Sequence, residues 1–128
     1  MAYEAAQIRF GNLTAAADLS SKQYYFVKLA SATTVNVCSA ITDIPIGVLQ
    51  NTPESGEAAE VCIFGITKVS ADGTLAAGNL IGTSADGQAD AIAAGTDTTV
   101  YTQGQAITAA SAGETTTMFL NPANCRAA

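Results

Sequence analysis

The sequence contains no histidine and no tryptophan, and it is poor in charged residues. Without histidine, the chain has no Ser-His-Asp or Cys-His catalytic arrangement, no imidazole acid–base group and no histidine metal ligand. It also lacks the glycine-rich loop that binds phosphate and the strained turn that presents a nucleophilic serine. These absences argue against an enzyme, and we expect no catalytic residue and no cofactor.

Basic residues are scarce as well. The chain has five Lys and Arg residues against eleven Asp and Glu residues, which gives a net charge of −6. The five cations are scattered, whereas a nucleic acid or an anionic membrane surface attracts clustered cations. We therefore expect neither nucleic acid nor a membrane as a direct partner.

Long apolar segments are also missing. No stretch approaches the roughly 20 apolar residues that a transmembrane helix needs. Residues 1–10 do not contain the apolar core of a secretory signal peptide. These features predict a soluble protein that is synthesised in the cytoplasm.

The three cysteines are Cys38, Cys62 and Cys125. Their odd number and wide spacing are not typical of a disulfide framework or a zinc site. Cys38 and Cys62 lie in apolar sequence and are expected to be buried as small hydrophobic side chains, whereas Cys125 near the chain end is open to exposure.

Asp86, Asp90 and Asp97 lie close together in the sequence and carry the oxygen ligands that calcium prefers. Their spacing is not that of an acidic calcium loop, and Asp86 is followed by a glycine as in a turn. We therefore expect no metal site.

The central feature of the sequence is a pair of apolar, β-branched segments, residues 44–50 and 60–69, joined by a polar connection. Such residues favour strands, and a proline and a glycine in the connection are typical of a turn. The second segment is apolar on both faces from Val61 to Phe64, as in a strand inside a sandwich or barrel. The sequence therefore predicts a long hairpin with Phe64 in the core.

The remainder of the chain predicts further short strands and no helix. No segment keeps an apolar period of 3.6 residues, and turn residues separate the apolar segments. The other expected strands are residues 23–29, 33–37, 79–83 with 88–91, 99–102, 104–108 and 115–120. Residues 11–21 are expected to be a connection, either irregular or with one helical turn. We predict an all-β fold, a small β-barrel or β-sandwich of about eight strands, with residues 11–128 as one domain.

Residues 1–10 are predicted to form an N-terminal extended arm. Two interpretations are open: a frayed end that joins the sheet near Ile8 and Phe10, or an arm that docks on a neighbouring molecule. Aromatic and arginine side chains are enriched at interfaces. The candidate binding residues of the arm are Tyr3, Gln7, Ile8, Arg9 and Phe10.

A series of short motifs in the second half of the chain resembles the small capsid decoration, or cement, proteins of tailed bacteriophages. Each motif is weak alone, and the resemblance lies in their order; Asn79 replaces the aspartate that is frequent in the family. The motifs are Ile46-Gly47-Val48, Gly65-Ile66-Thr67-Lys68-Val69, Ala77-Gly78-Asn79-Leu80-Ile81, Asp86-Gly87, Gly104-Gln105-Ala106-Ile107 and Ala112-Gly113-Glu114 followed by Phe119-Leu120.

The resemblance implies a structural protein that stabilises a phage head. Its implied partners are the major capsid protein and two further copies of itself, as a homotrimer at three-fold and quasi-three-fold positions of the outer capsid surface of the virion. The arm residues 2–10 would then contact the capsid, with Arg9 meeting an acidic group there. The alternatives are a trimeric phage fibre or receptor-binding module and a carbohydrate-binding β module.

Overall fold

The computed structural model describes residues 2–122, and within this range the chain forms nine strands and no helix. The all-β class predicted from the sequence is confirmed. No helix in this part of the chain is long and apolar enough to cross a membrane. The strands are β1 (Ala5–Ala15), β2 (Phe26–Leu29), β3 (Thr34–Val37), β4 (Gly47–Leu49), β5 (Ala58–Ser70), β6 (Leu80–Thr83), β7 (Ala89–Ala91), β8 (Gly104–Ala106) and β9 (Thr115–Leu120).

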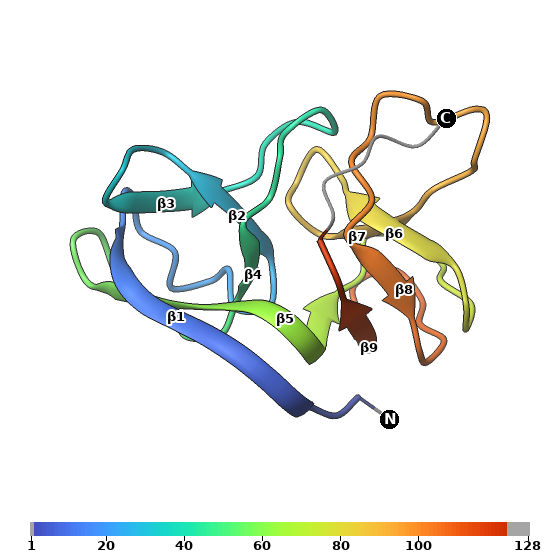
Figure 1. Cartoon of the computed structure of the whole chain (residues 1–128), viewed down its shortest axis with the longest axis horizontal. Coiled ribbons are helices and arrows are strands. Elements are labelled where there is room, and N and C mark those ends of the chain that lie inside the picture. The colour runs from blue at the N-terminus through green and yellow to red at the C-terminus, as the bar shows by residue number, and fades with distance from the viewer. Residues whose placement is uncertain (1, 123–128) are drawn as a thin grey trace.

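One nine-stranded sheet curls back on itself at one end. The strand order is β1-β3-β2-β4-β5-β9-β8-β6-β7, and β1 also pairs with β5. This additional pairing closes the first five strands into a ring, whereas β9, β8, β6 and β7 continue from β5 as a four-stranded extension. Figure 1 shows the ring and the extension side by side, with β5 passing from one to the other. The molecule is therefore part barrel and part open sheet.

Two hydrophobic cores fill the space on either side of the central strands. The first, the ring core, takes side chains from all five ring strands. The second, the inter-lobe core, takes side chains from β2, β4 and β5 and from all four strands of the extension. Alternate residues of the central strands therefore enter different cores: Val27, Leu49 and Val61 the ring core, and Phe26, Val48 and Cys62 the inter-lobe core.

The predicted central hairpin is confirmed. β4 pairs with β5 in antiparallel register, with Val48 opposite Cys62. The connection is held by the Asn51 side chain, whose amide nitrogen donates to the carbonyl of Ala58 at 2.9 Å. Its amide oxygen accepts from the backbone N–H of Glu60 at 3.0 Å. Asn51 thereby continues the hydrogen bonding of the ladder beyond the end of β4.

The placement of Phe64 in the core is wrong. Val61 and Cys62 are fully buried, as predicted, but the side chain of Phe64 is 40% exposed. The physical reason is that β5 leaves the ring at this point: the ring ladder with β4 ends at Cys62, and pairing with β9 begins at Gly65. Phe64 lies in the gap between these two ladders, where neither core covers it.

Several element boundaries also differ from expectation: β2 begins at Phe26 rather than at residue 23, β4 covers only Gly47–Leu49 of residues 44–50, and β8 ends at Ala106 rather than at residue 108. Residues 11–15, expected to be a connection, belong to β1, and residues 99–102, expected to be a strand, are not among the nine. The predicted pairing of residues 79–83 with 88–91 is confirmed as the β6–β7 hairpin. Its turn contains Gly87 at a φ of 83°, a conformation that glycine adopts readily.

The buried cysteines follow the prediction. Cys38 and Cys62 are free thiols with 1% and 0% exposure. Burial raises the pKa of Cys38 to about 12 and also raises the pKa of Cys62. Both therefore stay protonated at neutral pH and serve as packing groups; Cys125 lies outside the described residues.

The loop between β3 and β4 is organised by the carboxylate of Asp43. One of its oxygens accepts from the Nζ of Lys28 at 2.8 Å and from the backbone N–H groups of Ser39 and Ala40 at 2.8 and 3.0 Å. Burial alone would raise the pKa of Asp43, but these donors outweigh that effect, so the pKa lies below its usual value. The loop is thus tied to β2 by a charged group.

We predict that Phe26→Ala is more damaging than Phe64→Ala. Phe26 has 0% exposure, and truncating a buried Phe costs about 3–5 kcal/mol. Phe64 is half exposed and keeps one edge-to-face contact, with Phe119, so its truncation should cost at most about 1.5 kcal/mol. Urea unfolding of both variants measures the difference. Equal losses would contradict the assignment of β5 to two separate ladders.

We predict that Asp43→Asn lowers stability at neutral pH but not in acid. A carboxylate whose pKa is lowered by folding stabilises the folded state above its unfolded pKa of about 3.9, and this contribution is lost as pH falls through the folded pKa. The cost at pH 7 should be about 1 kcal/mol, because the group is partly exposed to solvent. Unfolding of both proteins in urea at several pH values provides the measurement. A difference that persists well below the unfolded pKa would contradict the role of the charge.

Candidate functional site

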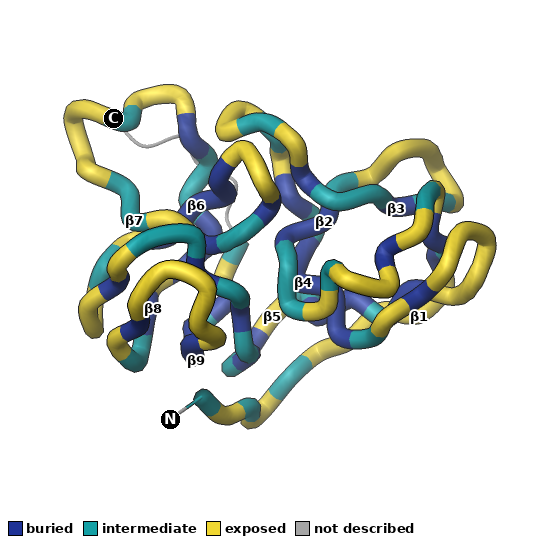
Figure 2. The backbone as a smooth tube through the Cα atoms, turned by 180° about the vertical axis from the view of Figure 1, so that it is seen from behind, coloured by how far each residue is buried: buried dark blue, intermediate teal, exposed yellow. Residues whose placement is uncertain are grey.

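Four of the five residues predicted to bind a partner, Gln7, Ile8, Arg9 and Phe10, lie on the N-terminal half of β1, and Tyr3 lies just before the strand. Residues 5–10 run along β5 as part of the sheet of their own chain, from the edge of β9 toward the ring (Figure 1). Figure 2 shows the same segment from behind as a mainly exposed part of the backbone. Of the two interpretations that the sequence left open, the structure has the segment joined to its own sheet.

The ladder between β1 and β5 is irregular. Its register shifts between Ala5 and Ile8, between Ile8 and Arg9, and between Phe10 and Leu13. Ala6 has a φ of 45°, and the carbonyl of Ala6 lies against Gly65, where a Cβ atom would collide with it. Gly65 itself has a φ of 120°, which other residues rarely adopt. Bulges of this kind bend a strand and change the direction in which its side chains point.

A polar network surrounds Arg9. Its guanidinium group is 2.9 Å from the carboxylate of Glu4 and 3.0 Å from that of Glu60, and its Nε donates to the side chain of Gln7 at 2.6 Å. Hydrogen bonding to Glu60 is the main cause that raises the pKa of Arg9. The one arginine in this segment is thus neutralised by two carboxylates of its own chain.

Two further contacts join the segment to the body of the protein. The Nε2 of Gln7 donates to the carbonyl of Ile66 at 2.9 Å. The hydroxyl of Thr117 on β9 accepts from the backbone N–H of Tyr3 at 2.7 Å and donates to its carbonyl at 3.2 Å. The Tyr3 side chain is left 45% exposed.

An apolar cluster lies beside this network. Ile8 is directly opposite Phe64 in the ladder, and the ring of Phe64 meets that of Phe119 edge-to-face at 5.6 Å. Ile8 is 55% exposed and Phe64 is 40% exposed. We call these three residues, Ile8, Phe64 and Phe119, the apolar cluster. Phe10, two residues further along β1, is also exposed, so only Phe26 among the four phenylalanines is fully buried.

The sequence therefore identified part of this surface and missed the rest. The sequence predicts Ile8 as an interface residue, but it predicts Phe64 in the core and Phe119 in an ordinary strand. No signal in the local sequence distinguishes an outward Phe from an inward one at these positions, because both lie in apolar strands. The partners of Arg9, Glu4 and Glu60, were also missed, since they lie 5 and 51 residues away.

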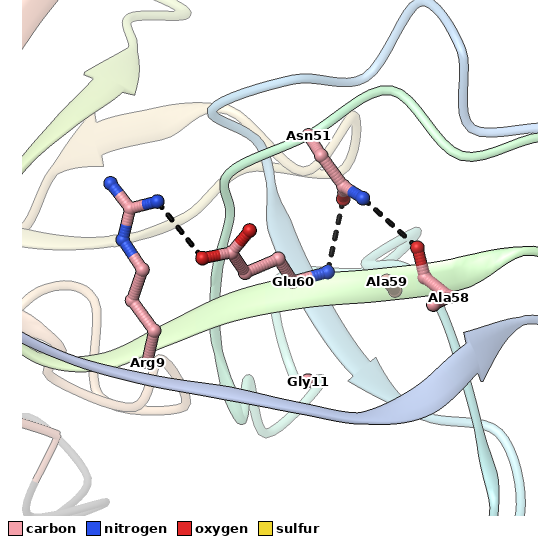
Figure 3. A pocket seen from close by; sticks show the side chains of 6 residues that line it. All are labelled: Arg9, Gly11, Asn51, Ala58, Ala59 and Glu60. Atoms are coloured by element: carbon pink, nitrogen blue, oxygen red, sulfur yellow. Dashed lines mark hydrogen bonds and ion pairs between the residues drawn. The ribbon is translucent and has the colours of Figure 1, made fainter.

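Two of the hollows on the described surface include residues that the sequence analysis considered. One, of about 270 Å³, is lined by Arg9, Gly11, Asn51, Ala58, Ala59 and Glu60 (Figure 3). Its polar groups are already bonded to one another, as the pairs Arg9–Glu60 and Asn51–Glu60 show. Nothing in this lining pairs a nucleophile with a base.

The other hollow, of about 190 Å³, has Asp90 and Asp97 among its lining residues. Burial, together with the nearby carboxylates of Asp72 and Asp97, raises the pKa of Asp90. Within residues 2–122, no group of three or more Cys, Asp or Glu side chains is arranged to hold a metal ion.

Comparison with known proteins shows that the fold of this chain is similar to that of a solved structure. By sequence, the chain matches no known protein family and no curated protein. By structure, it is similar to the solved N base of the head fibre gp8.5 in bacteriophage phi29, with a TM-score of 0.66 and 18% sequence identity. The similarity covers 94% of this chain and 99% of that one. The two chains therefore share one fold over almost their whole length.

We predict that Gly65→Ala releases residues 5–10 from β5. An alanine must adopt a φ of 120° there and its Cβ collides with the Ala6 carbonyl, a combination that costs about 1–3 kcal/mol or more. The matched control is Gly56→Ala, which imposes a φ of 85° in open space. Amide hydrogen exchange should show lost protection at residues 5–10 in the first variant only. Retained protection in Gly65→Ala would contradict the close backbone contact.

Proposed function

We propose that this protein is a structural component of a bacteriophage head, bound to the outer surface of the shell as a decoration protein. The fold is shared with a protein that forms the base of a phage head fibre, and the order of sequence motifs resembles decoration proteins. The role needs a binding surface and no catalytic group. We accordingly propose that the protein is not an enzyme and has neither nucleic acid nor a membrane as a partner.

The observation that carries the proposal is the apolar cluster, in which large apolar side chains from β1, β5 and β9 lie together at the surface. Large apolar side chains that gather at one place on a soluble protein mark contact sites, and aromatic residues dominate the energetics of such sites. Here Ile8 and Phe64 are exposed side by side, with Phe119 packed against Phe64. We propose that this cluster, with Tyr3 and Phe10 nearby, contacts the major capsid protein.

Arg9 receives a different role from the one that the sequence suggested. Its guanidinium group already pairs with Glu4 and Glu60, so a bond to an acidic group of the capsid would require that pairing to be broken or shared. We propose that Arg9 and Gln7 position β1 on β5, and that the apolar side chains make the attachment.

A homotrimer is part of the same proposal. The resemblance to decoration proteins implies three copies at three-fold and quasi-three-fold positions. Closed cyclic symmetry would bury apolar surface without open-ended growth. Three attachment surfaces per trimer would also strengthen binding to the shell through avidity.

A second candidate function is the base of a head fibre. It is favoured by the comparison itself, because the similar structure is described as such a base and is covered over 99% of its length. The two functions share the attachment to the head and differ in what is carried outward. Electron microscopy of complete phage particles labelled with an antibody against the protein separates them, since a fibre base lies at the foot of a radial fibre and a decoration protein carries none.

We predict that Phe64→Ser weakens attachment to phage heads by about tenfold or more, as expected for an aromatic residue at the centre of an interface. Binding is measured by sedimenting purified protein with isolated heads that lack it. Phe64 is half exposed, so the variant should fold. The matched control is Leu29→Ser at the end of β2, where the side chain is 53% exposed and lies away from the cluster.

Leu29→Ser should bind as the unmodified protein does. Equal loss in both variants would mean a general effect of removing surface apolar area, and undiminished binding by Phe64→Ser would contradict the proposed attachment surface.

A further inference from the structure

β1 consists of two halves that are held in different ways. Leu13 and Ala15 are buried in the ring core; Thr14 and Ala15 pair with β3, and Thr14 pairs with β5 as well. Residues 5–10 pair with β5 alone, and all their side chains except that of Gln7 are exposed. Segments with few buried contacts open locally at low cost, so the N-terminal half is the weakly held half.

Gly11 and Asn12 lie between the two halves and form a natural hinge. The ladder passes from the pair Phe10–Val61 to the pair Leu13–Ala59, three steps on β1 against two on β5. Both intervening residues are exposed, and no atom lies within 4 Å of the place where a Cβ of Gly11 would be. Glycine adopts a wide range of backbone conformations, so the chain can change direction here at little cost.

The surface that residues 2–10 cover is matched to this segment in particular. The carbonyl of Ala6 fits against Gly65, where a side chain would collide with it. Thr117 exchanges two hydrogen bonds with the backbone of Tyr3, and Glu60 pairs with Arg9. A regular strand of another sequence would lack the bulge at Ala6 and this pairing. The occupant that fits is the same segment, whether from its own chain or from a second copy.

We propose that residues 2–10 exchange between copies of this chain, so that the segment of one copy pairs with β5 and β9 of another. Every contact that the segment makes is present in each copy, so exchange breaks and remakes the same bonds and needs no new interface. A tethered segment has an effective concentration of about millimolar, which keeps it on its own chain in dilute solution. The exchanged form becomes populated when the local concentration of the chain approaches the millimolar range. The inference rests on the proposed function only in that binding to a phage shell would bring copies to such a concentration.

Two chains that each carry one new cysteine test the exchange. Ile8→Cys is introduced in one chain and Phe64→Cys in the other, because these residues lie directly opposite each other, and Cys125→Ser is included in both. The two are mixed in equal amounts with oxidised glutathione and analysed by mass spectrometry. We expect a disulfide between unlike chains at a yield several-fold above that of dimers from either chain alone, rising with total concentration toward the millimolar range.

The matched control is a mixture of Leu80→Cys and Gln105→Cys chains. These residues also lie directly opposite each other at the surface, but on β6 and β8, and β8 is bonded on both edges. The control should give no excess of mixed dimer. A single chain with both Ile8→Cys and Phe64→Cys should close an internal disulfide in dilute solution.

The proposal is overturned if the mixed dimer of the first pair stays at the level of the control pair at the highest concentration while the doubly substituted chain closes internally. Because the experiment uses the protein alone, its result is independent of whether the protein binds phage heads.

Discussion

The constraint on which the structure depends is the pairing of a single strand, β5, with three others along its 13 residues. One stretch of it completes the ring with β4 and β1, and residues 65–70 carry the extension through β9. In both the ring and the extension, buried backbone N–H and C=O groups of the neighbouring strands form their hydrogen bonds with β5. Breaking either ladder would separate the ring core from the inter-lobe core or leave one of them open to water.

The surface chemistry of the protein follows from that division. β5 contributes side chains to both the ring core and the inter-lobe core. Where it leaves the ring and begins to pair with β9, a side chain can lie outside both cores. Phe64 lies at this point, next to Ile8, which is exposed, and Phe119, which is partly buried. The exposure of Phe64 removes no side chain from either core, because the six alternating residues of β2, β4 and β5 that fill the two cores are fully buried.

The covering of β5 by the N-terminal half of β1 is maintained mainly by backbone hydrogen bonds and by polar contacts at the surface. Arg9, Gln7 and Glu4 form a network whose members are largely exposed or half-buried. Exposed ion pairs stabilise little, typically less than about 1 kcal/mol each. A segment held in this way can remain specific in its register, through Gly65 and Thr117, while its opening stays easy.

The sequence by itself determined the all-β class, the β4–β5 and β6–β7 hairpins, the last strand and the burial of Cys38 and Cys62. These features depend on local patterns: β-branched residues, turn glycines and the absence of a helical period. The tertiary structure alone decided that β1 pairs with β5, that Phe64 faces outward, and that Arg9 meets Glu60 51 residues away. Such features arise from contacts between segments that are distant in the sequence. The sequence around an apolar strand residue does not show whether another segment will cover that residue, so burial cannot be predicted from the strand alone.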